Sequence, residues 1–364
     1  MIKFRYFCKK LYTMLENVKT TPLSAYGEFG LIELLTKNIQ IKNKSTVLGV
    51  GDDAAIINTE GRHQVIAKDM LIEGVHFDIS YCPLKHLGYK AIAVNLSDAA
   101  AMNAHPEQVL VGIAASSRYT VEAIEELYKG IYLCCNRYGV DLVGGDTCSS
   151  VSGLQISVTV IGYAEPQQIV RRNTAKTNDL ICVSGDLGAA YLGLLILERE
   201  KKVFMQNPKN QPELEGFDYL IERQLKPEPR LDIIDNLRKK NILPNSMIDI
   251  SDGLASEILH ICKNSKKGCA IFEDKLPIDT LAYNTAMDFK LIPSTVALNG
   301  GEDYELLFTI DQKHYDAIRQ VEDVSIIGYI TDENEGCNFI SNDKKSIPLN
   351  AQGWDAYLKK TTTK

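Results

Sequence analysis

The chain has 364 residues, of which 45% are hydrophobic and 24% charged, a composition that excludes a disordered or membrane protein and favours an ordinary globular one. The formal net charge of -7 argues against a nucleic-acid surface, because phosphate backbones bind clustered lysines and arginines. The basic, aromatic start lacks the features of a signal peptide, and the nine scattered cysteines show no zinc spacing. These features favour a reduced cytoplasm.

The first half of the chain predicts strands that alternate with helices. Apolar residues at helical spacing predict a helix over residues 27–39. Strand-like segments follow, and the few residues between the apolar runs 54–57 and 63–67 indicate a hairpin. Next come a helix-like segment (86–104) and a strand-like segment (108–115). A long helix (120–139) then begins after Thr120 and stops at Gly139, and two strands follow (140–147 and 154–164).

The second half begins near Pro166 with a strand, a glycine turn and a helix, and residues 200–230 predict a loop with a short helix. The length favours two domains in an α/β fold of the α+β type. We therefore expect an N-terminal extension, two domains and a C-terminal segment with the bounds 1–24, 25–165, 166–350 and 351–364.

Acidic residues recur at the ends of apolar segments: Asp52, Asp53, Asp69, Asp98, Asp146, Asp249 and Asp252. Each alone has a simpler explanation, since Asp and Gly are common in turns. Taken together they suggest buried carboxylates, which need partners. Lysines and arginines are scarce in these segments, apart from Lys68, so Mg²⁺ is the expected counter-charge. Several aspartates on metal-bound phosphates are typical of phosphoryl transfer.

Glycine-rich turns at 49–51, 144–145, 184–188 and 299–301 support phosphate binding, although each is weak alone. No Walker A sequence occurs, which argues against a P-loop kinase. The segment GVGDDA also matches a dinucleotide-binding turn. Two carboxylates at that turn would repel a pyrophosphate, and a hairpin cannot form a Rossmann unit.

Seven motifs, in this order, closely resemble the thiamine-monophosphate kinase family: GEFGLI, GVGDDAA, KDMLIEGVHFD, AIAVNLSDAAAM, GGDT, IDISDGLASE and GGEDYELLFT. The resemblance covers residues 27–354. Shorter pieces are similar to aminoimidazole ribonucleotide synthetase, selenophosphate synthetase and the hydrogenase maturation protein that dehydrates carbamoyl groups. The resemblance implies ATP-dependent phosphorylation of thiamine monophosphate to thiamine diphosphate. It also implies an aminoimidazole ribonucleotide synthetase-like fold, with an N-terminal sheet domain that forms a homodimer, a C-terminal α/β domain, and ATP and several Mg²⁺ ions in the cleft between them.

The same resemblance assigns roles to individual residues. The metal ligands would be Asp53, Asp69, Asp98, Asp146, Asp249 and Asp252. The ATP contacts would be Tyr128, Gly145, Asp146, Arg172 and Ser251. The substrate contacts would be His76, Glu302 and Trp354, whose ring would stack on the thiamine heterocycles. Simpler structural roles remain open for four of them. His76 could be a strand histidine, Glu302 a turn acid, Trp354 a packing residue and Tyr128 a core residue.

The sequence departs from the family's pattern in two places. The family usually has hydroxyl residues before Asp69, where this chain has Ala67 and Lys68. This leaves the number of Mg²⁺ ions open, and Lys68 would be a fixed cation near phosphate. Thr174 replaces the glycine usual after the arginine motif, which loosens the role of Arg172. Two alternatives therefore stay open: a related enzyme acting on another small phosphorylated metabolite, and a non-catalytic nucleotide-binding homologue.

Overall fold

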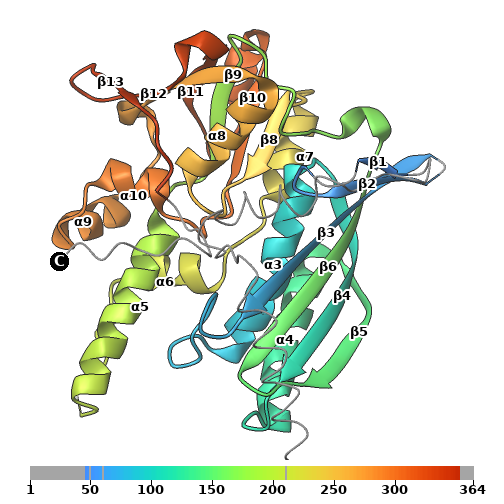
Figure 1. The fold of residues 1–364 in the computed structure, drawn as a ribbon, viewed down its shortest axis with the longest axis vertical. Coiled ribbons are helices and arrows are strands. Elements are labelled where there is room, and N and C mark those ends of the chain that lie inside the picture. Colours follow the sequence, from blue (N-terminus) through green and yellow to red (C-terminus); the bar gives the residue numbers. More distant parts are fainter. Residues whose placement is uncertain (1–45, 49–50, 60, 210, 353–364) are drawn as a thin grey trace, which may run out of the picture. The chain divides into compact units, whose positions relative to one another are not determined.

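The computed structural model describes residues 46–48, 51–59, 61–209 and 211–352, which belong to one compact unit, residues 41–354 (Figure 1). The helix expected over 27–39 and Trp354 lie outside the described residues. None of the helices in this part of the chain is long and apolar enough to cross a membrane.

The first sheet has six strands in the order β1-β2-β3-β6-β4-β5. Their bounds are Thr46–Leu48 (β1), Ala55–Thr59 (β2), Arg62–Ile72 (β3), His105–Ala115 (β4), Asp141–Ser149 (β5) and Leu154–Ala164 (β6). Strands β2 and β3 pair antiparallel from Thr59 and Arg62 outward. The hairpin prediction is therefore confirmed, and with it the exclusion of a Rossmann unit.

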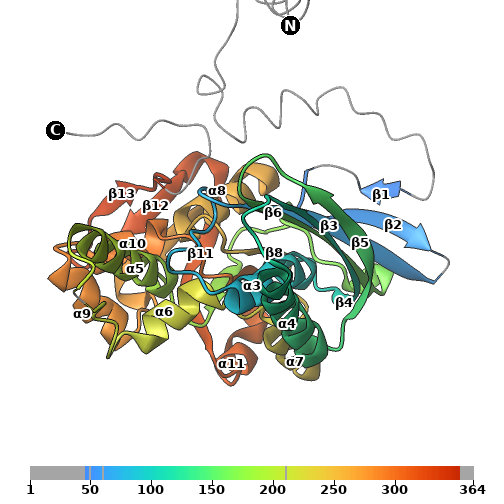
Figure 2. The same ribbon diagram turned by 90° about the horizontal axis from the view of Figure 1, so that it is seen from below.

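Helices α3 (Leu84–Ala101) and α4 (Val121–Tyr138) cover one face of this sheet (Figure 2). Thr120 caps α4 by accepting the N–H of Ala123, and Gly139 ends it at a φ of 66°, as predicted. The two helices touch at glycines: a Cβ on Gly88 would lie 1.9 Å from the carbonyl oxygen of Leu127, and one on Gly130 1.9 Å from that of Lys85. Any side chain at these positions would push the helices apart.

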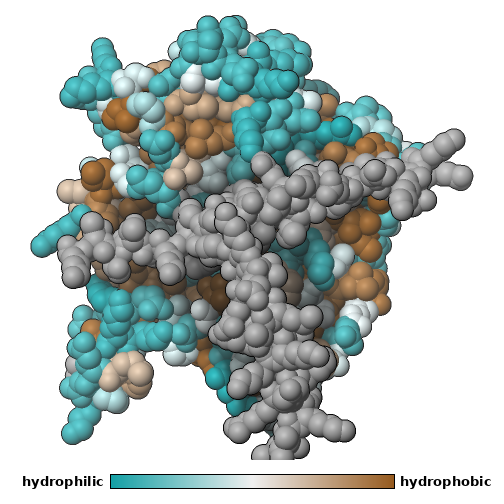
Figure 3. Space-filling model, in the orientation of Figure 1, coloured by the Kyte–Doolittle hydropathy of each residue, from teal (hydrophilic) through white to brown (hydrophobic). Residues whose placement is uncertain are grey.

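The other face of the first sheet carries exposed apolar side chains, among them Met70 and Leu110. On β3, Val65 and Ala67 are buried under the helices while Lys68 and Met70 point the opposite way. Hydrophobic residues also show on the flank of the molecule where this sheet lies (Figure 3). No described helix packs on this outer face (Figure 2).

The second sheet has seven strands in the order β13-β12-β9-β11-β7-β10-β8. Their bounds are Leu180–Ser184 (β7), Ser246–Asp249 (β8), Lys267–Phe272 (β9), Leu306–Ile310 (β10), Val324–Asp332 (β11), Cys337–Ile340 (β12) and Ser346–Pro348 (β13). The helices among and around them are Ala189–Gln206 (α5), Asp218–Leu225 (α6), Leu231–Lys239 (α7), Leu254–Ser265 (α8), Thr280–Asp288 (α9), Pro293–Asn299 (α10) and Tyr315–Ile318 (α11). Residues 200–206 continue α5, so the loop predicted there is shorter than expected.

Both faces of the second sheet are buried. On β7, Val183 joins an apolar cluster with α8, whereas Cys182 joins a different one with α7. That second cluster also contains Ala100 and Ala101 from the end of α3. Helix α3 therefore packs against both sheets, and this contact sets the position of the residues near its C-terminal end. The expected domain boundaries at 165 and 350 stay a prediction.

Candidate active site

Three carboxylates meet where the two sheets approach each other through α3. Asp53 precedes β2, Asp98 lies in the last turn of α3, and Asp249 ends β8. Each offers an oxygen, and these atoms all lie within 4.8 Å of one another. We call these three residues the acidic cluster. It brings together half of the six predicted metal ligands.

Helix α3 supplies supporting groups from the residues next to Asp98. The hydroxyl of Ser97 donates a 2.6 Å hydrogen bond to Oδ2 of Asp249. The side-chain oxygen of Asn95 accepts the N–H of Asp69 at 3.1 Å, which attaches β3 to the same helix. Both side chains are completely buried. Asp69, the fourth predicted ligand, is therefore held beside the cluster.

Arg172 neutralises part of this negative charge. Its Nη2 lies 2.6 Å from Oδ1 of Asp53, and its Nε lies 3.1 Å from Oδ1 of Asp52. Asp52 also accepts the N–H of Asp53 at 3.0 Å and the N–H of Arg172 at 3.2 Å. The scarcity of basic residues near these aspartates in the sequence does not mean that positive charge is absent, because the distant Arg172 supplies some of it. The adjacent Asp52 holds the turn and that arginine.

The acidic cluster still lacks positive charge. Burial and the neighbouring carboxylates raise the pKa of Asp53 and of Asp98 well above the ordinary value, against the effect of Arg172. Burial, followed by Asp249 and Glu302, raises the pKa of Asp69 to about 6. Oδ2 of Asp53 is buried without a hydrogen-bond partner. Converging carboxylate oxygens with one unsatisfied atom fit a hard divalent cation such as Mg²⁺.

Two loops run side by side next to the acidic cluster. The N–H of Tyr304 donates to the carbonyl of Ile250 at 2.8 Å, and that of Glu302 to the carbonyl of Ser251 at 2.7 Å. A Cβ on Gly301 would lie 2.4 Å from that Ser251 oxygen, so the close approach requires glycine. This pairing brings predicted ATP and substrate contacts, Ser251 and Glu302, to the same place.

Glu302 forms an ion pair with Lys90, a buried lysine of α3. The hydroxyl of Tyr304 donates to Oε1 of Glu302 at 3.3 Å. Glu302 and Tyr304 have φ values of 70° and 51°, an uncommon conformation for residues with side chains. Such strain is frequent at functional sites. The substrate role of Glu302 stays a prediction.

Asp252 lies at the edge of this region. Its N–H donates to Oε1 of Glu257, a buried acid in the first turn of α8, at 3.2 Å. Burial, and then the charge of Asp252, raises the pKa of Glu257 well above its ordinary value. A second acid therefore accompanies this predicted ligand.

Gly145 and Asp146 lie apart from the acidic cluster, on edge strand β5. Gly145 pairs with Val111, Val111 with Val158, and Val158 with Asp69, so β5 is three strands away from β3. At about 4.8 Å per strand, this is roughly 14 Å along the sheet. The chain's own fold does not bring Asp146 to the three clustered carboxylates.

Asp146 shares the outer face of the sheet with Lys68, as the strand register shows. Asp146 pairs with Gly112 and Gly112 with Ser157, and the ammonium of Lys68 donates to the Ser157 hydroxyl. Asp69, one residue from Lys68, points to the other face because side chains alternate along a strand. A Cβ on Gly145 would lie 1.8 Å from the Val111 carbonyl oxygen, so only glycine fits beside β4.

The remaining predicted residues are more dispersed. Tyr128 is half-buried on α4, with its ring centre 5.9 Å from that of Tyr132. His76 lies in an exposed turn after β3, and its Nδ1 accepts the N–H of Ile72 at 3.0 Å. The alternative of a strand histidine is therefore wrong. The position of Trp354 is outside the described residues.

Lys90, Asn95, Ser97 and Tyr304 were not singled out from the sequence. Asn95, Ser97 and Tyr304 lie inside the quoted motifs, and Lys90 lies directly before the motif that contains Asp98. Three of the four belong to the helix that carries Asp98. Asp98 lies inside α3, as the helix-like segment 86–104 predicted, whereas Asp69 lies within β3 and not at its end.

Comparison with known proteins supports the resemblance. Residues 51–164 match the family described as AIR synthase related protein, N-terminal domain. The chain is 39% identical over 329 residues to the thiamine-monophosphate kinase of Buchnera aphidicola subsp. Schizaphis graminum, which covers 88% of this chain and 96% of that protein. It is 34% identical over 336 residues to the thiamine-monophosphate kinase of Bacillus subtilis, covering 91% of this chain and 99% of that one. The chain belongs to the thiamine-monophosphate kinase family.

A solved structure, AaThiL complexed with AMPPCP and TMP, has the same fold, with a TM-score of 0.78 and 31% identity. The match covers 93% of the present chain and 100% of the AaThiL chain. The predicted fold class is thus confirmed. In the present chain, the motifs around Asp53, Asp98 and Asp249 converge in space.

Proposed function

We propose that this chain transfers the γ-phosphoryl group of ATP directly onto the phosphate of thiamine monophosphate, which gives thiamine diphosphate. The observation that carries the proposal is the acidic cluster, in which Asp249 is buried and Asp53 and Asp98 are partly buried, and which is short of positive charge. Family membership supports it, as does the related structure complexed with TMP and with AMPPCP, an ATP analogue. ATP is therefore the proposed phosphoryl donor.

The carboxylates of the site are the proposed ligands of its metal ions. Asp53, Asp98 and Asp249 would hold Mg²⁺, with Asp69 and Asp252 beside them. When bound, Mg²⁺ would offset the charge of the carboxylates and of the phosphate oxygens. Arg172 already holds Asp53 in place through its 2.6 Å contact.

The chain's own residues would mainly bind and align the two substrates. The acceptor phosphate is anionic at neutral pH, so transfer needs no strong general base, and alignment supplies most of the acceleration. Arg172 and Ser251 would contact the nucleotide. Glu302 would attract the cationic thiazolium ring, and Lys90 and Tyr304 fix the direction of its carboxylate. His76 and Trp354 are proposed for the same substrate.

A homodimer would complete the site. The uncovered outer face of the first sheet, with exposed Met70 and Leu110, offers a surface for a second copy. Asp146 lies on this face and too far from the acidic cluster to join it within one chain. We therefore infer that the partner's Asp146 reaches the nucleotide, and that Lys68 supplies positive charge nearby.

Mixing two inactive variants tests this arrangement. In a dimer of one Asp98→Asn chain and one Asp146→Asn chain, one site would carry both changes and the other neither. Mixed dimers should therefore regain activity that neither variant has alone. If Asp146 acts within its own chain, mixing restores nothing, and the shared site is disproved.

The activity itself is tested with ATP, Mg²⁺ and thiamine monophosphate, by chromatographic detection of thiamine diphosphate. Thiamine and aminoimidazole ribonucleotide precursors serve as competing acceptors. The proposal is supported if thiamine monophosphate is phosphorylated and the competing acceptors are not. It is overturned if only another acceptor is phosphorylated. A reducing cytoplasm belongs to the same proposal, since the cysteines of the described residues are all free thiols.

A further inference from the structure

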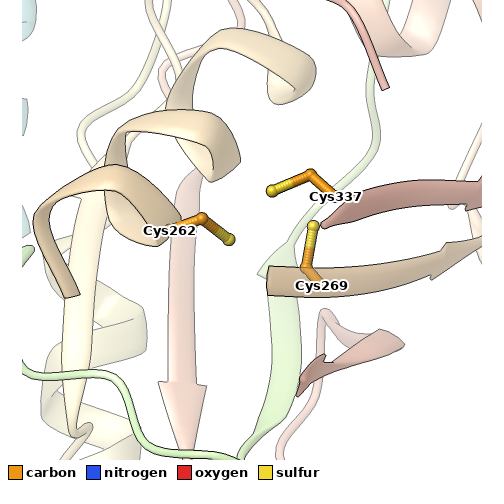
Figure 4. A group of neighbouring side chains, drawn as sticks. All are labelled: Cys262, Cys269 and Cys337. Atoms are coloured by element: carbon orange, nitrogen blue, oxygen red, sulfur yellow. The ribbon is translucent and has the colours of Figure 1, made fainter. Parts of the chain in front are cut away.

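Three cysteines that are distant in the sequence converge beside the second sheet. Cys262 lies in α8, Cys269 in β9 and Cys337 at the start of β12. Their sulfur atoms all lie within 4.8 Å of one another. Figure 4 shows the three sulfurs directed toward a common centre from three separate elements. The spacing of these cysteines along the chain matches no zinc motif, so this group was not predicted.

The separation of the sulfurs suits a metal ion bound by three thiolates. A zinc–sulfur bond is about 2.3 Å long, so three sulfurs around one ion lie about 3.8–4.0 Å apart. This separation falls within the 4.8 Å that encloses the three atoms. Small rotations of the side chains would therefore complete the geometry without movement of the backbone.

The backbone around the group is fixed. Cys269 and Cys337 are paired residues of the adjacent parallel strands β9 and β12. The N–H of Cys269 donates to the carbonyl of Gly336 at 3.1 Å. The sulfur of Cys269 accepts the backbone N–H of Asn338. The backbones of two of the three cysteines are thus held in place before any ligand binds.

The surroundings are apolar and open on one side only. Cys262 and Cys269 are 2% and 0% exposed and belong to a core that includes Ile258 and Ile271. Cys337 is only partly buried, so an ion can enter at β12. No carboxylate or imidazole joins this group among the residues that the structure describes. The ligands are therefore sulfur alone, which selects thiophilic ions over Mg²⁺.

We propose that Cys262, Cys269 and Cys337 form a binding site for one Zn²⁺ ion, separate from the acidic cluster, with water as the fourth ligand on the Cys337 side. Binding converts three thiols into thiolates and releases their protons to solvent, with no change of oxidation state. The ion would tie the end of α8 to β9 and β12. Since α8 begins two residues after Asp252, zinc would stabilise the helix next to the proposed kinase site.

Cobalt substitution tests the site in the reduced, full-length protein. Co²⁺ bound by thiolates gives a charge-transfer absorption in the near ultraviolet, whereas Co²⁺ on carboxylates does not. Titration should give this band with saturation at one Co²⁺ per chain, and Zn²⁺ should displace it. Zn²⁺ should also raise the melting temperature. A folded, fully reduced wild-type chain without the band would overturn the proposal.

Variants locate the ion. Cys337→Ser, at the partly exposed ligand, should weaken Co²⁺ binding at least about tenfold, since even changes outside the ligand shell cost that much. Cys148→Ser, at an exposed cysteine of β5, is the matched control and should leave the band intact. Asp98→Asn should also leave it intact, which separates this site from the acidic cluster. A band that survives in Cys337→Ser at full affinity contradicts the assignment.

Discussion

The hydroxyl of Ser97 donates a 2.6 Å hydrogen bond to Asp249, and this bond joins α3, which covers the first sheet, to β8 of the second. Ser97 is completely buried and adjacent to Asp98. One turn of helix thus provides one carboxylate and orients another. The acidic cluster depends on this contact between the two halves of the molecule.

Removing this hydroxyl should impair catalysis. Hydrogen bonds to charged groups contribute about 1.5–3 kcal/mol, so Ser97→Ala should lower kcat/KM about ten- to hundredfold. Steady-state kinetics with both substrates measures the effect. Ser294→Ala removes a similar 2.7 Å bond to Glu273 elsewhere in the fold and is the control. Equal activity of the two variants would contradict the role of Ser97.

Replacement of Asp98 should separate activity from stability. Asp98→Asn removes one of three crowded carboxylates, so we expect turnover to fall by roughly 10²–10³-fold or more. Without Mg²⁺ the melting temperature should rise, because burial and Asp69, followed by Asp249 and Asp53, disfavour the charged form of Asp98. Calorimetry with and without Mg²⁺ measures this. Asp288→Asn, at the exposed end of α9, should change neither quantity.

The ion pair of Glu302 and Lys90 should connect substrate binding with stability. Glu302→Gln should raise the KM for thiamine monophosphate and leave that for ATP unchanged. It also leaves the Lys90 ammonium buried, with the carbonyl of Gln224 at 2.8 Å as its partner among the described residues. The melting temperature should therefore fall.

A double variant distinguishes the two effects. Lys90→Met together with Glu302→Gln should recover stability, because no charge remains buried, but not the affinity for thiamine monophosphate. Full recovery of affinity would mean that Glu302 acts only by neutralising Lys90.

Glu228 should protect the fold against acid. Burial would raise its pKa, but hydrogen bonds from Lys226, Tyr138 and Tyr89 lower it below the ordinary value of 4.5. A depressed pKa stabilises the folded state at pH values above the ordinary value, and this contribution is lost as the pH falls through the lower, folded-state pKa.

Glu228→Gln should thus lower the melting temperature at pH 7, and the difference from wild type should shrink below about pH 4.5. Glu222→Gln is the matched control, since Glu222 also pairs with Lys226, at 3.0 Å, but is 62% exposed. A constant difference across the pH range would exclude a depressed pKa of Glu228.

Local features of the fold were predictable because local residues determine them. Thr120 and Gly139 mark the ends of α4 through their own hydrogen bonds and backbone angles. The short connection before Arg62 permits little besides a hairpin. Such features need no knowledge of distant contacts.

Features that depend on tertiary structure were not predictable. Arg172 reaches Asp53 across 119 positions of sequence, and no local pattern announces such a pair. Asp98 was predicted to lie in a helix, but its position beside Asp249 depends on the packing of α3 against β8. Cys262 and Cys337 meet only because β12 adds beside β9. The alternation of side chains along β3 places Lys68 and Asp69 on opposite faces of the sheet. Only the structure shows which of these faces the helices cover.

The glycine contact between α3 and α4 has a genetic consequence. Gly88 lies ten residues before Asp98, which is about 15 Å along the helix. A Cβ there would overlap the carbonyl of Leu127, so even alanine must displace α3 and, with it, the carboxylate at its far end. A selection for inactive alleles should therefore return substitutions at Gly88 and Gly130, and a survey restricted to residues near the substrates would overlook both.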